Sequence, residues 1–237
     1  MQIGTLYIIP TPLSEQPSET SFPTYNLLII SQIKHYLVEE VRTARRFISS
    51  LKLGINIETL YFTTISKDST ATHLAEFAQS MCEGTSWGMM SEAGCPAVAD
   101  PGHSVVMQAH KINAKVVPLI GPNAIILALM ASGLNAQNFE FHGYLPVKPV
   151  ERDIKIKQIE TESIRTGKTQ IFIETPYRNI TLCDALLRVC VPHTLLCVAQ
   201  DLTGVQEQII TQNINQWKKA PKIADKVPSI FLLNGKI

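Results

Sequence analysis

The sequence predicts an α/β protein of two α/β domains, the first built on a mainly parallel sheet and the second on a mixed sheet. Strand and helix patterns alternate along the first half of the chain, which is the rhythm of βαβ units. In the second half several strand patterns follow one another closely, as they do in mixed sheets. The chain has 237 residues, of which 45% are hydrophobic and 17% charged, so a sizeable buried core is expected. We place the domains at residues 1–118 and 119–237.

The first half carries strand patterns separated by helix patterns. Thr24 is expected to cap the first helix and Gly54 to end the second, because hydroxyl side chains favour helix starts and glycine favours helix ends. Ser69 is expected to begin the third helix, and 100–102 to cap and start the fourth. The expected strands are 4–9, 36–38, 57–65, 86–90 and 115–119. The expected helices are 25–34, 41–53, 69–81 and 103–113.

The second half begins with a helix pattern at 124–132, whose residues are nearly all small and apolar, so this helix is expected to be buried. The charged helix pattern at 148–166 is expected to be exposed. A third helix is expected at 176–189. The expected strands are 139–141, 143–146, 169–173, 194–199, 206–211 and 227–233.

The composition predicts no strong overall charge, no membrane span and no metal site. The net charge of +1 gives no strong global field toward nucleic acid or membrane, although a local basic patch remains compatible with it. No apolar run approaches the ~20 residues that span a bilayer. The five cysteines form no CxxC pair, so we expect no metal site, and most of them should be small buried hydrophobes. A cytoplasmic location fits this cysteine usage.

Two loops at expected strand ends offer main chain with little side chain. One is SEAGCPAVADPG, residues 91–102, and the other is IGPNA, residues 120–124. Glycine lets a ligand lie against the backbone and bind its N–H and C=O groups, which suits a ligand with an amino acid end and an adenosine end. Ordinary strand-to-helix turns explain these loops equally well. The usual signatures of phosphate loops, zinc proteases and hydrolases do not occur.

An ordered set of motifs across nearly the whole chain resembles the tetrapyrrole methylase superfamily, and most closely its ribosomal RNA small subunit methyltransferase I family, in a short form without the family's C-terminal extension. The motifs are GTLYIIPTP at 4–12, SEAGCPAVADPG at 91–102, VVPLIGPNA at 116–124, ASGL at 131–134, FHGYLP at 141–146, FIETPYR at 172–178 and AQDLT at 199–203. The resemblance implies S-adenosylmethionine as cofactor, held in a cleft between the domains, methyl transfer to an RNA ribose 2′-hydroxyl, and a homodimer.

The resemblance also implies which residues hold the cofactor. The loop at 91–102 would follow the methionine and ribose part, 121–124 would close over it, and residues near 173 and 203 would frame the adenine. The implied cofactor residues are Pro10, Glu92, Ala93, Gly94, Cys95, Val98, Gly121, Asn123, Ala124, Ile173, Glu174 and Thr203.

The chain departs from the family pattern at several of these positions. Glu92 stands where aspartate is usual, Cys95 where threonine is usual and Asn123 where serine is usual. The family's Glu-Asp-Thr-Arg motif becomes EEVR at 39–42.

A ribose hydroxyl is a weak nucleophile, so a general base would help its proton to leave. The candidate catalytic residues are Glu39, Arg42 and Glu92. Each carboxylate could equally be a structural hydrogen-bond acceptor. Arg42, Arg45 and Arg46 could contact RNA phosphates or form a solvated helix face, and the same holds for Lys148 and Arg152. Arg178 could face the cleft or form a surface ion pair, and His103 and His142 are the histidines expected to be nearest the cleft.

Three functions therefore stay open on the sequence. The first is methylation of ribosomal RNA. The second is methylation of a small molecule or tetrapyrrole. The third is a catalytically silent module that binds the cofactor, which the altered motifs permit.

Overall fold

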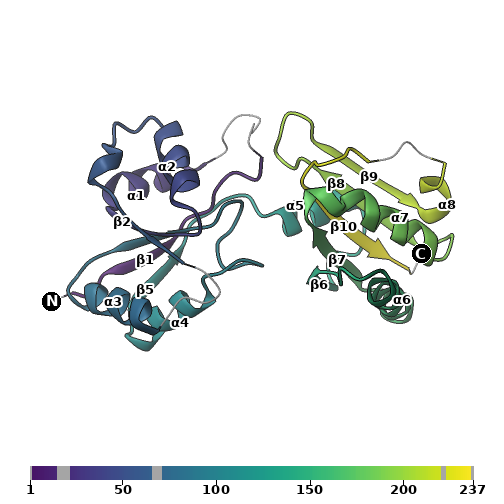
Figure 1. Ribbon diagram of the computed structural model, residues 1–237, viewed down its shortest axis with the longest axis horizontal. Helices are drawn as coiled ribbons and strands as arrows, with labels where there is room; N and C mark the ends of the chain where they lie inside the picture. Colours follow the sequence, from purple (N-terminus) through teal and green to yellow (C-terminus); the bar gives the residue numbers. More distant parts are fainter. Residues whose placement is uncertain (1, 15–21, 66–70, 220–222, 236–237) are drawn as a thin grey trace. The chain divides into compact units, whose positions relative to one another are not determined.

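The computed structural model describes residues 2–14, 22–65, 71–219 and 223–235 (Figure 1). The chain divides into two compact units: unit 1 is Met1–Pro12 with Glu19–Pro122, and unit 2 is Leu13–Ser18 with Asn123–Ile237. The division lies at Pro122 instead of residue 118. Leu119 stays with unit 1 because it is buried in that unit's core and its N–H donates to the Ile8 carbonyl at 2.9 Å.

Unit 1 contains a five-stranded parallel sheet, as expected. The strands lie in the order β3-β2-β4-β1-β5, and every neighbouring pair is parallel. Their bounds are Thr5–Ile8 for β1, His35–Val38 for β2, Tyr61–Thr64 for β3, Trp87–Met90 for β4 and Lys115–Pro118 for β5.

Helices cover both faces of this sheet (Figure 1). Side chains of α1 and α2 pack with Tyr36 on one face, and those of α3 and α4 pack with Met89 on the other. This double coverage explains why the inner strands β2 and β4 are largely buried, whereas the edge strands β3 and β5 are not. The bounds are Thr24–Gln32 for α1, Val41–Ser50 for α2, Ile57–Thr59 for the 3₁₀ turn η1, Ala71–Cys82 for α3 and His103–Lys111 for α4.

Three local expectations for unit 1 need correction or lie outside the described chain. Thr24 is the first residue of α1, and Pro23 occupies the N-cap without a side-chain hydrogen bond. The segment 57–65 begins with η1 because Asn56 accepts a hydrogen bond from the Glu58 N–H and so starts a turn. The expected helix start at Ser69 lies outside the described residues.

Unit 2 contains the mixed sheet, in the order β6-β7-β10-β8-β9. Strands β6 and β7 are parallel, whereas β10 is antiparallel to both β7 and β8, and β9 is antiparallel to β8. The bounds are Phe139–Tyr144 for β6, Thr169–Glu174 for β7, Leu195–Gln200 for β8, Gln208–Asn213 for β9 and Ser229–Asn234 for β10.

Helices α6 and α7 pack against one face of this sheet around Phe172 and Phe231, and α5 packs against the other face (Figure 1). The short helix α8 was not expected, because four residues carry no periodic pattern. It begins with a capping box between Asn213 and Gln216. The bounds are Ala124–Ser132 for α5, Pro149–Thr166 for α6, Pro176–Arg178 for the 3₁₀ turn η2, Asn179–Val189 for α7 and Ile214–Trp217 for α8.

The burial expected for two helices of unit 2 was wrong in part. Helix α5 buries Ala128 and Leu129 against the sheet, but it leaves Ile126 44% and Met130 73% exposed. Helix α6 is not exposed all round, because Arg152 and Glu160 face the core and are buried. In the described part of the chain, no helix is long and apolar enough to cross a membrane.

Candidate active site

The five parallel strands of unit 1 bring their carboxyl ends to one edge of the sheet. The chain leaves β2 toward β3 on one side, and it leaves β4 toward β5 on the other side. The carboxyl ends of β2 and β4 therefore flank a topological switch point, where ligands bind in open α/β sheets. Glu39 follows β2 and the loop 91–102 follows β4, so both lie at this point.

Glu39 and Glu92 meet at the switch point. The Glu92 N–H donates a hydrogen bond to Glu39 Oε1 at 3.3 Å, while the Glu92 side chain is exposed. Burial raises the pKa of the half-buried Glu39, and repulsion from Asp100 and Glu92 raises it further, against the effect of the Glu92 hydrogen bond. A carboxyl group with a raised pKa at a strand-end crevice is a candidate proton acceptor.

Sequence reasoning treated Asp100 only as part of a helix cap. The helix N-cap is instead Gly102, which makes no side-chain cap, and the Asp100 charge acts on Glu39. The two residues are far apart in sequence, so only the fold brings them together. No local pattern could have identified this pair.

The loop 91–102 is closed against the end of β1 by backbone hydrogen bonds. Thr11 N–H donates to the Gly94 carbonyl at 2.9 Å, and Gly94 N–H donates to the Thr11 carbonyl at 3.1 Å. Gly94 has a φ of +75°, while Ala97 and Ala99 have φ of +65° and +66°. The left-handed region costs a non-glycine residue roughly 1–2 kcal/mol. Strain of this kind is often found at ligand sites, which makes the loop a candidate for one.

Apart from Glu92, the exposed side chains of this loop are small. Glu92, Ala93, Val98 and Ala99 are exposed, whereas Gly94 is buried in its pairing with Thr11. The exposed part of the loop therefore offers main chain and little else, as the sequence predicted. A ligand that bonds to N–H and C=O groups can approach it closely.

Only glycine fits at position 121, because Pro10 occupies the space that a side chain would need. A Cβ atom at Gly121 would lie 2.1 Å from Pro10 Cγ and 2.4 Å from Pro10 Cβ. The neighbouring Pro122 carbonyl accepts a hydrogen bond from the Cys95 thiol at 3.4 Å, which connects the two glycine-containing loops within unit 1. The glycine at 121 is thus required by its packing against Pro10.

The remaining implied cofactor residues lie in unit 2. Asn123 caps α5 by accepting a hydrogen bond from the Ile126 N–H at 3.2 Å, and Ala124 is the first residue of that helix. Ile173 and Glu174 end β7. The buried Glu174 carboxylate is engaged by Arg178 Nη2 at 2.5 Å, so only its main chain remains for a ligand. Thr203 follows β8.

The segment after β8 also carries backbone strain. Asp201 and Thr203 have φ of +47° and +66°, an unusual conformation that is especially rare for a β-branched residue. The Asp201 carboxylate accepts the Gln206 N–H at 2.9 Å and fixes this turn. The strain again falls on a segment that the sequence associated with the cofactor.

The basic helix α2 keeps two of its three arginines exposed. Arg42 and Arg46 are exposed, whereas Arg45 forms an ion pair with Glu58 of η1. The Arg42 N–H is capped by the Glu40 carboxylate at 3.0 Å. The cluster expected from sequence is therefore reduced to Arg42 and Arg46, which lie one helical turn apart.

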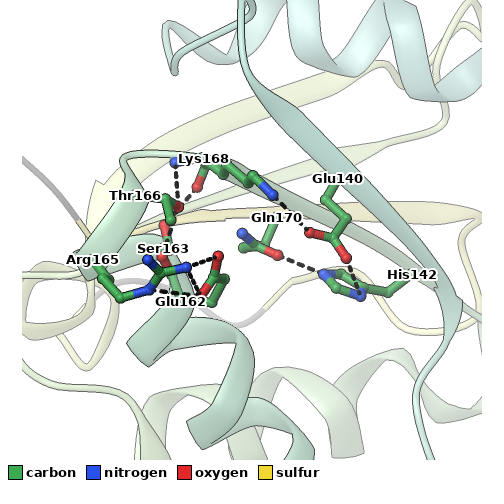
Figure 2. A network of polar contacts seen from close by, with 8 residues as sticks. All are labelled: Glu140, His142, Glu162, Ser163, Arg165, Thr166, Lys168 and Gln170. Atoms are coloured by element: carbon green, nitrogen blue, oxygen red, sulfur yellow. Dashed lines mark hydrogen bonds and ion pairs between the residues drawn. The ribbon is translucent and has the colours of Figure 1, made fainter.

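The two histidine candidates lie in different units. His103 begins α4 and is exposed. His142 lies on β6 with its Nε2 atom 2.5 Å from Oε1 of the buried Gln170 and its Nδ1 atom 4.0 Å from Glu140, which also pairs with Lys168 (Figure 2). These contacts give His142 a structural role between β6 and β7.

Among the described residues, no group of three or more histidine, cysteine, aspartate or glutamate side chains could hold a metal ion. No protein-family model matches the chain.

Several curated proteins are similar to the chain along most of its length. A ribosomal RNA small subunit methyltransferase I of Vibrio cholerae is 31% identical over 204 residues, which cover 86% of this chain and 67% of that protein. The protein of the same name from Halalkalibacterium halodurans is 29% identical over 237 residues and covers 98% and 77% of the two chains.

Two solved structures share the fold. The methyltransferase CobJ superposes with a TM-score of 0.61 at 15% identity, over 99% of this chain and 94% of that chain. A uroporphyrin-III-C-methyltransferase from Thermus thermophilus superposes with a TM-score of 0.55 at 14% identity, over 99% and 93%. The two-unit α/β architecture is therefore that of these methyltransferases. Together with the sequence similarity over most of its length, this identifies the chain as a methyltransferase of the ribosomal RNA small subunit methyltransferase I family.

Proposed function

We propose that this methyltransferase uses S-adenosylmethionine to methylate a ribose 2′-hydroxyl of ribosomal RNA. The observation that carries the proposal is the Glu39 carboxyl group, whose pKa is raised at the switch point, beside a strained loop of nearly bare main chain. The names of the curated relatives support ribosomal RNA as the acceptor. The same sequence similarity favours RNA over a tetrapyrrole, because the tetrapyrrole enzyme resembles this chain in fold alone.

The residues around the loop 91–102 fit such a cofactor. Exposed Glu92, Ala93 and Val98 leave the main chain accessible, and the left-handed Ala97 and Ala99 hold it in an unusual path. In unit 2, the strained turn at Thr203 and the main chain of Ile173 are the corresponding candidates. When bound, S-adenosylmethionine supplies a methyl group on a sulfonium, which is already activated for displacement.

The contribution of the protein is then to orient the acceptor and to take its proton. In its ionised form the Glu39 carboxylate can accept the proton of the 2′-hydroxyl. A raised pKa makes the carboxylate a stronger base than an ordinary surface glutamate. Arg42 and Arg46 would hold phosphates of the RNA near this edge.

The decisive experiment is methyl transfer from labelled S-adenosylmethionine to fractionated RNA. The expected result is label in small-subunit ribosomal RNA, on a nucleotide that resists alkaline cleavage because its 2′-oxygen is methylated. Label in a small molecule would replace this proposal with the second function. Cofactor binding without transfer to any cell fraction would favour a silent module.

Replacing Ala93 with leucine tests the cofactor loop. Because Ala93 is exposed, the larger side chain should cover the main chain without disturbing the fold, and affinity for S-adenosylmethionine should fall by roughly tenfold, which corresponds to about 1.4 kcal/mol. Calorimetry measures the affinity and a melting curve measures stability. Ala136→Leu, at another exposed position, is the matched control. Equal affinity in both variants would remove the loop from the cofactor site.

Replacing Arg42 and Arg46 together with alanine tests RNA binding. Each lost phosphate contact should flatten the slope of log affinity against log salt by about one unit. The double variant should therefore bind RNA more weakly and with less salt dependence, while its cofactor affinity stays unchanged. Lys111→Ala with Lys115→Ala removes the same charge at exposed positions around the amino end of β5 and should leave the slope unchanged. If the salt dependence of RNA binding is the same in the arginine variant and the parent, Arg42 and Arg46 do not contact RNA.

We also propose a cytoplasmic homodimer. Ile126 and Met130 support the dimer, since they form an exposed apolar stripe one turn apart on α5. Light scattering at several protein concentrations tests it, and a mass of one chain throughout would contradict it. The substrate proposed above supports the cytoplasmic location.

A further inference from the structure

The carboxyl edge of the sheet in unit 2 gathers exposed aromatic rings. Strands β6, β7 and β8 run in the same direction, because β6 is parallel to β7 and β10 is antiparallel to both β7 and β8. Tyr144 is the last residue of β6, and Tyr177 lies in η2 immediately after β7. Since Tyr144 is in register with Ile173 of β7, the two tyrosines come from neighbouring strand ends.

Both tyrosines are exposed to an extent that packing does not explain. Tyr177 is 79% exposed and Tyr144 is 56% exposed, and Tyr177 is the most exposed aromatic residue in the described part of the chain. A β-bulge between Phe141 and Tyr144 contains Gly143 with a φ of +64°. Bulges of this kind redirect side chains next to functional sites.

The turn that carries Tyr177 is firmly held. Glu174 accepts hydrogen bonds from the Thr175 N–H at 2.7 Å and from Arg178 Nε at 3.0 Å, and its carboxylate is almost fully buried. The residues on both sides of Tyr177 are therefore fixed while its ring points to solvent. A tyrosine on such a backbone has only two side-chain dihedral angles to order, so it loses little conformational entropy when a second ring stacks on it.

Groups that attract anions follow Tyr144 along the chain. Helix α6 begins at Pro149, beside Tyr144, and its N-terminus has no side-chain cap, so its free N–H groups and its dipole favour an anion. Arg152, one turn into the helix, is only 5% exposed, and its Nε atom has no hydrogen-bond partner. Arg152 packs on the buried side of α6, and the tilt of helical side chains toward the N-terminus favours a position of its guanidinium near the uncapped turn. Among the described residues Arg152 has no ion-pair partner.

Lys148 adds a second cation at the same end. It is exposed, and it pairs with Glu151 at 3.1 Å, an exposed contact that contributes little and can be exchanged for a phosphate. Positive charge beside exposed rings is what single-stranded nucleic acid binds, because its phosphates are anionic and its bases stack on aromatic side chains.

We propose that this edge, made of Tyr144, Tyr177, Lys148, Arg152 and the N-terminus of α6, binds unpaired nucleotides of the RNA acceptor. A base stacks on Tyr177, and a neighbouring phosphate lies at the start of α6. The inference rests on the proposed function and narrows its substrate class. Bases within a duplex have no free face for Tyr177, so the methylated nucleotide lies in or beside an unpaired segment.

The test compares a fluorescent unpaired RNA oligonucleotide with the same strand in a duplex, by anisotropy at fixed salt. The parent protein should bind the unpaired strand more tightly. Tyr177→Ala should weaken that binding by roughly tenfold and leave duplex binding unchanged, whereas Tyr177→Phe keeps the ring and the affinity. Tyr61→Ala is the matched control, because Tyr61 is 62% exposed but lies at the amino end of β3 in unit 1.

A second readout separates this inference from the proposed function. In methyl transfer to small-subunit RNA, Tyr177→Ala should raise KM with little effect on kcat. If the parent methylates RNA but Tyr177→Ala and Tyr144→Ala bind unpaired RNA as the parent does, this edge is not the RNA site and the proposed function stands. If the parent binds duplex as tightly as the unpaired strand, stacking is likewise excluded. If the parent neither binds nor methylates RNA, both proposals fail.

Discussion

Replacing Glu39 with glutamine is expected to reduce the rate of methyl transfer by roughly 10²–10⁴-fold, the usual contribution of a general base. The amide still accepts the Glu92 N–H hydrogen bond seen at 3.3 Å, so the loop 91–102 keeps its support. It cannot accept a proton, however. Single-turnover rates with saturating cofactor and RNA measure the loss. Calorimetry should show that affinity for S-adenosylmethionine is unchanged.

The neighbouring glutamate supplies the control for this variant. Glu40→Gln changes an exposed carboxylate and keeps an oxygen that can cap the Arg42 N–H, so its rate should match that of the parent. A Glu39→Gln variant that is as active as the parent would show that Glu39 is a structural acceptor. Since burial and the nearby carboxylates raise the pKa of Glu39, the parent's kcat/KM should fall on the acid side at a pH above the ordinary glutamate value.

The same substitution should stabilise unit 1. A raised pKa means that the folded state disfavours the ionised carboxylate, so ionisation of Glu39 costs stability as the pH rises from the unfolded pKa to the raised folded one. Glutamine does not ionise and avoids this cost. Glu39→Gln should therefore melt at a higher temperature than the parent at neutral pH. The difference should vanish below the ordinary glutamate pKa, where both side chains are neutral.

Replacing Glu160 with alanine is expected to destabilise unit 2 by about 3–5 kcal/mol, the cost of breaking a buried charged network. The Glu160 side chain is fully buried and accepts hydrogen bonds from the Val191 N–H at 2.7 Å, Thr194 Oγ1 at 2.7 Å and Lys157 Nζ at 2.9 Å. Alanine leaves the buried Thr194 hydroxyl and the Val191 N–H without this acceptor. Urea denaturation of the parent and the variant measures the difference.

Glu162→Ala, two positions further along α6, is the control for Glu160. Glu162 pairs with exposed Arg165, so its removal should cost about 1 kcal/mol or less. Burial by itself would raise the pKa of Glu160, but the hydrogen bonds from Lys157, Thr194 and Val191 outweigh it, and the pKa is lowered. The charge-dependent stabilisation is therefore complete above the unfolded pKa and is lost as the pH falls through the lower folded pKa. If the difference in unfolding free energy between the parent and Glu160→Ala stays constant through this acidic range, the charge of Glu160 does not stabilise unit 2.

Local patterns in the sequence determined the secondary structure and the fold class. The apolar run of α5 gave its bounds at Ala124–Ser132, and the alternation of strands and helices gave the parallel sheet of unit 1. Glycine, proline and alanine gave the backbone-rich loop at 91–102, because those residues act on the chain in their own vicinity. These features depend on neighbours in the sequence, so one sequence is enough to predict them.

The tertiary structure decided which side chains meet. Glu39 and Asp100 act on each other only because β2 and β4 are neighbours in the sheet. Arg45 is not a candidate for RNA binding, because η1 places Glu58 where it forms an ion pair with Arg45. The burial of Arg152 and the exposure of Met130 depend on which helix face meets the sheet. Charge and burial at a residue depend on parts of the chain far away in sequence, and therefore a residue's type and spacing could nominate these candidates but could not choose among them.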